Sequence, residues 1–259
     1  MMIKFTERCT MGCSHCLNDA KADGKDMPFD VLLDTLDFLK EHNLGRSHLI
    51  ITGGEPTEHP AFDLFMNRII DFHKQTNHFT VVTVTTNGEN VQNDPERFKG
   101  YVKKANDAGF HLLFQVSADT RYYPRRINVT KRIFREEGFV LVDNCIRAMY
   151  PQGRALTNNY PWVAKCSKCF NVRSISHQIP EGSTLADIES HLTRNQKFCT
   201  PHIGIYGTIK LGESDLCTPC ACIYDDMPTI MKKIRTFQCH KCDHVNKNLP
   251  QLFKALLNG

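Results

Sequence analysis

The feature that most constrains this chain is a regular alternation of strand-like and helix-like segments over its first 150 residues. Runs of apolar and β-branched residues predict strands at residues 3–6, 49–51, 79–85, 110–117 and 139–142. Between them, apolar residues at helical spacing and helix start and stop residues predict helices at residues 28–42, 62–72, 95–108 and 128–137. This alternation implies parallel strands with helices outside the sheet.

The alternation predicts an α/β fold with five strands, and a sixth strand is expected near residues 148–156. An open doubly wound sheet and a partial barrel both satisfy this pattern. In both architectures, ligands bind at the carboxyl ends of the strands. Residues that follow a predicted strand are therefore the first place to look for function.

The alternation stops near residue 160, which predicts a domain boundary close to Pro161. Residues 1–160 then form the α/β domain, and residues 161–259 form a smaller domain rich in cysteine. Within the second part, residues 203–211 alternate in the manner of a hairpin. Residues 249–257 are expected to form a short final helix.

Twelve cysteines point to metal binding in a chain of this size. No membrane span and no signal peptide is evident, so we expect a cytoplasmic protein, where disulfides are disfavoured. The net charge of +4 argues neither for nor against a nucleic-acid partner. The cysteines fall into two groups, one near the N-terminus and eight between residues 166 and 242, with Cys145 alone between them. Two metal-bearing regions are therefore expected.

The first group, Cys9, Cys13 and Cys16, has the spacing C-x3-C-x2-C directly after the first predicted strand. Three thiolates can hold three irons of a [4Fe–4S] cluster and leave the fourth iron open to another ligand. A zinc loop or half of a ferredoxin-like motif are the alternatives. After the second predicted strand comes Gly53-Gly54-Glu55-Pro56, whose glycines allow the backbone to approach a ligand.

Together, the two motifs resemble those of the radical S-adenosylmethionine (SAM) superfamily, although His15 stands where an aromatic residue is usual. The resemblance implies a partial (β/α)6 barrel. It also implies that residues 53–56 bind the amino group of SAM, while its amino and carboxylate groups chelate the open iron. Reductive cleavage of SAM would then give a 5′-deoxyadenosyl radical that abstracts hydrogen from a substrate.

Two further strand ends place polar side chains near this site. The resemblance implies that Thr86, Asn87, Ser117 and Asp119 contact the ribose and carboxylate of SAM; helix capping or turn formation is the alternative. Arg154 lies in a Pro-x-Gly-Arg-Ala turn found in many relatives, which places it near SAM or substrate. A solvated residue at a helix start is the alternative. By position, three candidates for catalysis follow: Asp119, Tyr122 and Arg154.

The C-terminal cysteines resemble the twitch domain, a shortened SPASM domain. The resemblance implies that an auxiliary [4Fe–4S] cluster is held by Cys199, Cys217, Cys239 and Cys242. Such a cluster suits electron transfer during an oxidation. Four extra cysteines depart from this pattern: Cys166, Cys169, Cys220 and Cys222. Three alternatives stay open for them: ligands of a second cluster or of zinc, replacements for members of the quartet, or free thiols. Cys145 is expected to be a buried free thiol.

A basic stretch with two tyrosines follows the fourth predicted strand, at residues 121–135. It suggests an anionic substrate such as a nucleotide or a modified base in DNA, although a solvated helix face explains it equally well. By size and cysteine layout, the closest family is the twitch-type alcohol dehydrogenases of aminoglycoside biosynthesis, which favours a small molecule. A peptide substrate, a rearrangement, and a metal-bearing nucleic-acid-binding protein without catalysis are the alternatives. Flavodoxin or ferredoxin is the expected reductant.

Overall fold

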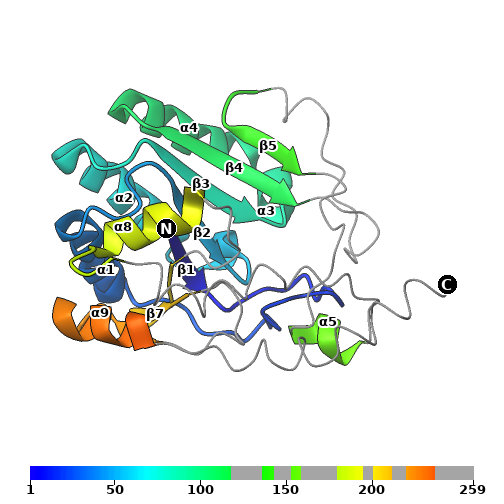
Figure 1. Ribbon diagram of the computed structural model, residues 1–259. Coiled ribbons are helices and arrows are strands. Elements are labelled where there is room, and N and C mark those ends of the chain that lie inside the picture. The colour runs from blue at the N-terminus through cyan, green and yellow to red at the C-terminus, as the bar shows by residue number, and fades with distance from the viewer. Residues whose placement is uncertain (118–135, 143–152, 159–179, 195–200, 212–219, 237–259) are drawn as a thin grey trace, which may run out of the picture.

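The computed structural model describes residues 1–117, 136–142, 153–158, 180–194, 201–211 and 220–236. These residues form one eight-stranded sheet in the order β5-β4-β3-β2-β1-β6-β7-β8 (Figure 1). The strands are β1 (Met2–Thr6), β2 (Leu49–Gly53), β3 (Val81–Thr86), β4 (His111–Ser117), β5 (Phe139–Val142), β6 (His202–Ile203), β7 (Thr208–Lys210) and β8 (Ala221–Cys222). The helices are α1 (Phe29–Glu41), η1 (Pro56–Glu58), α2 (Phe62–Thr76), α3 (Glu89–Asn93), α4 (Pro95–Ala108), α5 (Gly153–Thr157), α8 (Leu185–Arg194) and α9 (Met227–Thr236).

Strands β1 to β5 are all parallel, which confirms the predicted α/β fold. One face of the sheet is apolar and packs against the helices, as the contact of Phe5 in β1 with Phe65 in α2 shows. Phe98 of α4 likewise contacts Phe114 of β4. The sheet does not close on itself, in agreement with a partial barrel. Its shape brings the carboxyl ends of the parallel strands to one edge.

The opposite face of the sheet is more polar. In the register of β1 and β2, Lys4 lies beside Thr52, and both side chains are buried. Farther along the sheet, Thr83 of β3 is hydrogen-bonded to Nε2 of His48 at 2.8 Å. Because side chains alternate between the faces of a strand, this polar row lines the face away from α1, α2 and α4.

The predicted helix ends near α4 are confirmed. Asp94 caps α4 by accepting a hydrogen bond from the backbone nitrogen of Arg97, and Pro95 is the first helical residue. Gly109 follows the helix with φ +99°, a left-handed conformation that glycine adopts without steric cost. The predicted helix over 128–137 lies largely outside the described residues, and the one over 249–257 entirely outside them.

The sixth strand was expected near residues 148–156. The helix α5 at residues 153–157 contradicts the second half of this expectation, and residues 148–152 lie outside the described ranges. Within the described residues, the sixth parallel strand is β6, which pairs with β1 on the side away from β2. Its position is set by apolar burial, because Ile203 joins the same core as Ile3.

The predicted hairpin over 203–211 is confirmed by the antiparallel pairing of β6 with β7. Strand β8 extends this pairing, so residues from the cysteine-rich part of the sequence continue the sheet of the first part. The proposed boundary near Pro161 lies outside the described residues and stays a prediction. Within the described ranges, no helix has the length and apolar character needed to cross a membrane.

Candidate functional site

The three N-terminal cysteines lie on a long loop between β1 and α1. Its two arms run side by side like a hairpin: the backbone nitrogen of Glu7 bonds to the carbonyl of Lys25 at 2.7 Å, and that of Cys9 to the carbonyl of Lys21 at 2.9 Å. The arms hold a tip of residues 10–20, which contains Cys13 and Cys16. The tip therefore projects from the carboxyl end of β1, where a ligand site is expected in this fold.

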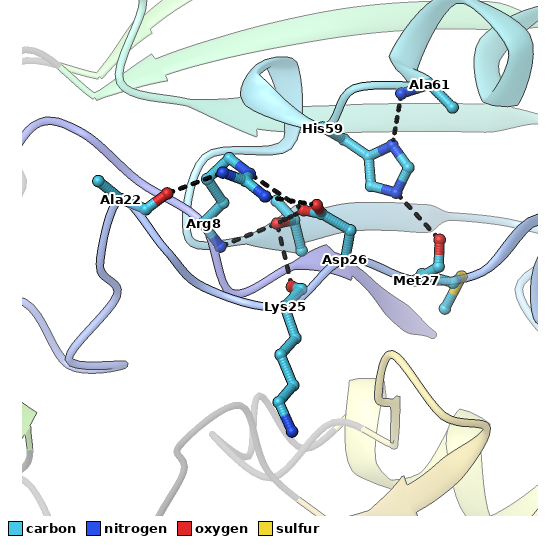
Figure 2. A network of polar contacts seen from close by, with 8 residues as sticks. Arg8, Ala22, Lys25, Asp26, Met27, His59 and Ala61 are labelled. Carbon is cyan, nitrogen blue, oxygen red and sulfur yellow. Dashed lines mark hydrogen bonds and ion pairs between the residues drawn. The ribbon is translucent and has the colours of Figure 1, made fainter.

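A network of polar contacts anchors the base of this loop (Figure 2). Arg8 donates from Nη2 to Oδ2 of Asp26 at 2.8 Å and from Nη1 to the carbonyl of Ala22 at 2.8 Å. The Thr6 hydroxyl also donates to Asp26. Burial raises the pKa of Asp26, but the bonds from Arg8 and Thr6 outweigh it and hold that pKa below its ordinary value. Asp26 therefore joins the arms as a carboxylate.

His59 ties the loop to the turn after β2 (Figure 2). Its Nδ1 accepts a hydrogen bond from the backbone nitrogen of Ala61, so Nε2 carries the proton and donates to the carbonyl of Met27 at 3.0 Å. Burial lowers the pKa of this ring. A neutral histidine thus fixes the end of the cysteine loop against η1.

The three thiols of the loop are free and lie close enough together to influence one another. Cys13 is buried, and the other two are partly buried. Burial raises the pKa of Cys9 to about 11 and that of Cys13 to about 12; negative charge on Glu55 and Glu58 adds to the shift of Cys9, and the neighbouring cysteines add to that of Cys13. Cys9 and Cys13 are therefore protonated until a metal displaces the protons.

The turn Gly53-Gly54-Glu55-Pro56 packs directly on the start of the cysteine loop. The backbone nitrogen of Gly54 bonds to the carbonyl of Thr6 at 2.7 Å, and that of Glu55 to the carbonyl of Arg8 at 2.7 Å. A Cβ on Gly54 would lie 2.2 Å from that Arg8 oxygen, and one on Gly53 would lie 2.5 Å from the Thr6 oxygen. Only glycine allows this approach. Pro56 begins the short helix η1.

Glu55 is buried at the point where β2, β3 and the cysteine loop meet. Its Oε1 accepts bonds from the backbone nitrogen and hydroxyl of Thr57, at 3.1 and 2.6 Å, and from the hydroxyl of Thr86 at 2.7 Å. Its Oε2 accepts a bond from the backbone nitrogen of Asn87 at 2.6 Å. Burial raises the pKa of Glu55, while these donors favour the carboxylate. Oε2 accepts one bond where Oε1 accepts three, so Oε2 is the oxygen with room for a further donor.

Asn87 links this carboxylate to the first cysteine. Its side-chain Nδ2 lies 3.9 Å from Sγ of Cys9, within reach of a weak N–H···S bond. Its Oδ1 accepts a bond from the backbone nitrogen of Glu89 at 2.9 Å, so the predicted turn is present too. Thr86 and Asn87 therefore gather with Glu55 and Cys9, as their positions at the end of β3 predicted.

Ser117 is half-buried at the carboxyl end of β4, in register with Val142 of β5. Asp119 and Tyr122, two of the three residues predicted for catalysis, lie outside the described residues. The third, Arg154, contacts the cysteine loop: its Nε donates to the carbonyl of Cys13 at 2.8 Å and its Nη1 to the carbonyl of Ala20 at 2.7 Å. Arg154 does lie at the start of a helix, but its side chain is bonded to protein rather than solvated.

A model of the radical SAM superfamily matches residues 3–151, more than half of the chain. The chain belongs to the radical SAM superfamily. Its cysteine loop after β1 and its Gly-Gly-Glu-Pro turn after β2 both lie within the matched residues. Membership identifies the chain as an enzyme and supports the binding of SAM and of a [4Fe–4S] cluster.

No curated protein matches the chain in sequence. Among solved structures, BtrN in complex with AdoMet (another abbreviation of SAM) and 2-DOIA has a TM-score of 0.52 at 12% identity, covering 96% of this chain and 85% of BtrN. Native anSMEcpe with bound AdoMet and Cp18Cys peptide has a TM-score of 0.47 at 13% identity, covering 93% of this chain and 81% of anSMEcpe. The likeness to BtrN shows that this chain and the radical SAM enzyme BtrN have the same fold.

The donor set fits the groups that the superfamily uses. Each of the three cysteines can bind a different iron of a [4Fe–4S] cluster, which asks for more widely spaced sulfurs than a single ion does. Within the described ranges, no three His, Cys, Asp or Glu side chains are grouped to hold a single metal ion. The free acceptor position on Glu55 suits an ammonium group. These residues can therefore hold both a cluster and SAM.

Sequence reasoning missed several residues that shape this site. Glu58 accepts bonds from the backbone nitrogen and hydroxyl of Thr10, both at 2.9 Å, and Asn18 donates from Nδ2 to the carbonyl of Gly53 at 3.3 Å. The Arg8–Asp26 pair was missed as well. Their partners are mostly backbone atoms or residues at irregular spacing, so no pattern in the sequence points to them.

Two of the remaining cysteines are described. Cys222 lies opposite Thr208 in the pairing of β7 with β8, and the thiol of Cys220 donates to the carbonyl of Ile209 at 3.3 Å. The others predicted as ligands or left open lie outside the described residues: Cys145, Cys166, Cys169, Cys199, Cys217, Cys239 and Cys242. The auxiliary cluster therefore stays a prediction.

The raised pKa values of Cys9 and Cys13 predict slow alkylation in metal-free protein. With a pKa of about 11, Cys9 is a thiolate in about one molecule in a thousand at pH 8, and Cys13 is ionised even less. Iodoacetamide labelling mapped by mass spectrometry should therefore be slow at both residues and rise steeply above pH 10. Urea-unfolded protein is the control, in which both should react as ordinary thiols; equal rates in folded and unfolded protein would contradict the prediction.

Proposed function

We propose that Cys9, Cys13 and Cys16 hold the [4Fe–4S] cluster of this radical SAM enzyme, and that Glu55 accepts the ammonium group of SAM beside it. The observation that carries the proposal is the direct contact between the two motifs. Glu55 bonds through its backbone to Arg8, next to Cys9, and through its side chain to Asn87, whose amide reaches the Cys9 sulfur. A ligand held by Glu55 would thus lie beside the cluster.

The protein residues around this site bind, orient and exclude water. Glu55 is fully buried, so a bond from it to an ammonium is not weakened by competing solvent. The Asn87 amide donates to a cysteine sulfur, and such bonds raise the reduction potential of a cluster. When bound, the cluster and SAM supply a 5′-deoxyadenosyl radical that abstracts hydrogen from the substrate. We propose that Ser117 faces the bound SAM and that Thr86 acts on it through Glu55, to which its hydroxyl donates.

We further propose that the substrate is a small molecule or a nucleotide and that the net reaction is an oxidation. The basic residues 121–135 support an anionic substrate, and the layout of the C-terminal cysteines supports an auxiliary cluster that accepts the substrate's electron. Asp119 and Tyr122 are the proposed acid–base residues. Flavodoxin or ferredoxin is the proposed reductant. Deuterium transfer from labelled candidate compounds into 5′-deoxyadenosine tests the substrate class.

Anaerobic reconstitution tests the central proposal. Wild-type protein with dithionite and SAM should form 5′-deoxyadenosine, and SAM should change the electron paramagnetic resonance (EPR) spectrum of the reduced cluster. The triple variant Cys9→Ala/Cys13→Ala/Cys16→Ala should lose both, whereas Cys145→Ser, the predicted free thiol, should keep both. A wild-type loop that binds zinc and ignores SAM would refute the proposal.

A further inference from the structure

The short helix α5 lies against the cysteine loop and away from β5, the described element that precedes it in the chain (Figure 1). Its first residues follow the α/β unit in sequence, more than 130 positions after the tip of the loop at residues 10–20. Even so, α5 and the residue after it contact the loop through both side chains and backbone. An element this short gains little stability from its own hydrogen bonds. Its contacts with the loop therefore decide where it lies.

The guanidinium of Arg154 spans the tip of the loop. Nε donates to the carbonyl of Cys13 at 2.8 Å, and Nη1 donates to the carbonyl of Ala20 at 2.7 Å. Nη1 also lies 3.2 Å from Oδ1 of Asp19, with which it forms an ion pair. A planar guanidinium offers several donors in a fixed arrangement, so one side chain joins the Cys13 and Ala20 ends of the tip. A lysine amine cannot reproduce this geometry.

The backbone of α5 and the residue after it add two contacts, and the first of them needs glycine at position 153. The backbone nitrogen of Arg154 donates to the carbonyl of Cys16 at 2.9 Å, and the side-chain Nδ2 of Asn158 donates to the carbonyl of Ser14 at 2.8 Å. Gly153 has φ +52°, and a Cβ there would lie 2.4 Å from the carbonyl oxygen of Cys16. The carbonyls of Cys13, Ser14, Cys16 and Ala20 are thus all bonded from one short segment.

The tip has little structure of its own to replace these bonds. Residues 10–20 form no helix or strand, and the nitrogen of Cys16 bonds to the carbonyl of Cys13 at 3.2 Å in a turn. We infer that Arg154, with the backbone of α5, clasps the cysteine loop, so that Arg154 is a positioning residue for Cys13 and Cys16 and not a substrate contact. The role in cluster binding rests on the proposed function, whereas the clasp itself does not.

Hydrogen–deuterium exchange of metal-free protein tests the clasp without any cofactor. Arg154→Met and Arg154→Lys should both speed exchange of the backbone amides of Cys16 and of position 154, the two N–H groups bonded at this contact, by about tenfold or more, because two charged hydrogen bonds that hold it are lost. Two variants serve as controls. Thr157→Ala removes a 3.1 Å bond from its hydroxyl to the Arg154 carbonyl within α5, and Arg97→Lys alters a distant arginine bonded to Asp63. Both should leave the loop unchanged.

Reconstituted protein gives the second readout. Both Arg154 variants should hold less iron in the N-terminal site and show a weaker SAM-dependent change in the EPR spectrum, with lysine giving no rescue. Loop exchange and SAM response equal to wild type, combined with lost substrate turnover, would overturn the inference and restore a catalytic role. If wild-type protein shows no SAM response while Arg154→Met still loosens the loop, the proposed function fails and the clasp stands.

Discussion

Replacing Gly54 with alanine is expected to lower 5′-deoxyadenosine formation by about 100-fold or more, since a displacement of about 1 Å near reacting groups has an effect of that size. The added Cβ would lie 2.2 Å from the Arg8 carbonyl oxygen and 2.7 Å from its carbon, so the turn and the cysteine loop must move apart. Both motifs are held by backbone, and no side chain can rotate away to relieve the clash. The bonds of Gly54 to Thr6 and of Glu55 to Arg8 would be lost.

The same substitution should reduce the iron content of the reconstituted protein and lower the stability of the metal-free protein by about 1–3 kcal/mol, the usual cost of overpacking. Gly100→Ala is the matched control, because a Cβ there meets no atom within 4 Å inside α4. It should be neutral or stabilise the protein by about 0.5–1 kcal/mol. Thermal unfolding and iron assays separate the two variants. A Gly54→Ala protein with normal iron and activity would show that the motif contact is dispensable.

Much of the α/β unit could be predicted because its determinants are local. The apolar spacing of Leu32, Leu36 and Leu39 gave the buried face of α1, and Asp94 with Pro95 marked the start of α4. The site motifs could be read for a related reason. A cysteine triplet and a glycine-rich turn each follow a strand, and parallel strands bring their carboxyl ends together. Because β1 and β2 are neighbours in the sheet, Glu55 after β2 lies next to the cysteine loop after β1.

The rest depends on contacts that leave no pattern in the sequence. Strand β6 pairs with β1 from 200 positions away, so the alternation that predicted the hairpin over 203–211 could not reveal this pairing. Arg154 was predicted at the site, but its partners are carbonyl oxygens, which every residue carries. Residue type therefore suggested a substrate contact, while the structure shows a contact with the loop. The contact of Glu58 leaves no pattern either, because its carboxylate accepts a bond from the backbone nitrogen of Thr10.

Glu55→Gln is expected to weaken SAM binding by about 10- to 100-fold, because a hydrogen bond to a charged group contributes about 1.5–3 kcal/mol. The substitution keeps the shape of the side chain but removes the charge that attracts an ammonium. It also brings two donors together. In the wild type, Oε1 accepts a bond from the backbone nitrogen of Thr57 and Oε2 accepts one from that of Asn87. In the variant, either orientation of the new amide therefore points its NH2 group at one of these N–H groups.

The buried donor left without an acceptor should cost a further 1–3 kcal/mol, roughly, in the stability of metal-free protein. The pH dependence gives an independent check. Because burial raises the pKa of Glu55, native wild type binds that proton more tightly than the unfolded chain does. Its free energy of unfolding should therefore fall as the pH rises above the ordinary glutamate value of 4.5, and Glu55→Gln should lack this component.

Thr86→Val separates the charge of Glu55 from the network around it. This variant removes the hydroxyl that donates to Oε1 at 2.7 Å and accepts from the backbone nitrogen of Gly88 at 3.0 Å, and it leaves the carboxylate, Oε2 and the Asn87 bond in place. It should lose about 1–3 kcal/mol of stability, because one hydrogen bond is lost and a buried N–H is left without an acceptor, and it should bind SAM nearly as wild type does. Titration of the reduced cluster with SAM, followed by EPR, measures both variants. If Thr86→Val weakens SAM binding as much as Glu55→Gln, the carboxylate acts through the local structure, and its role as the ammonium acceptor is wrong.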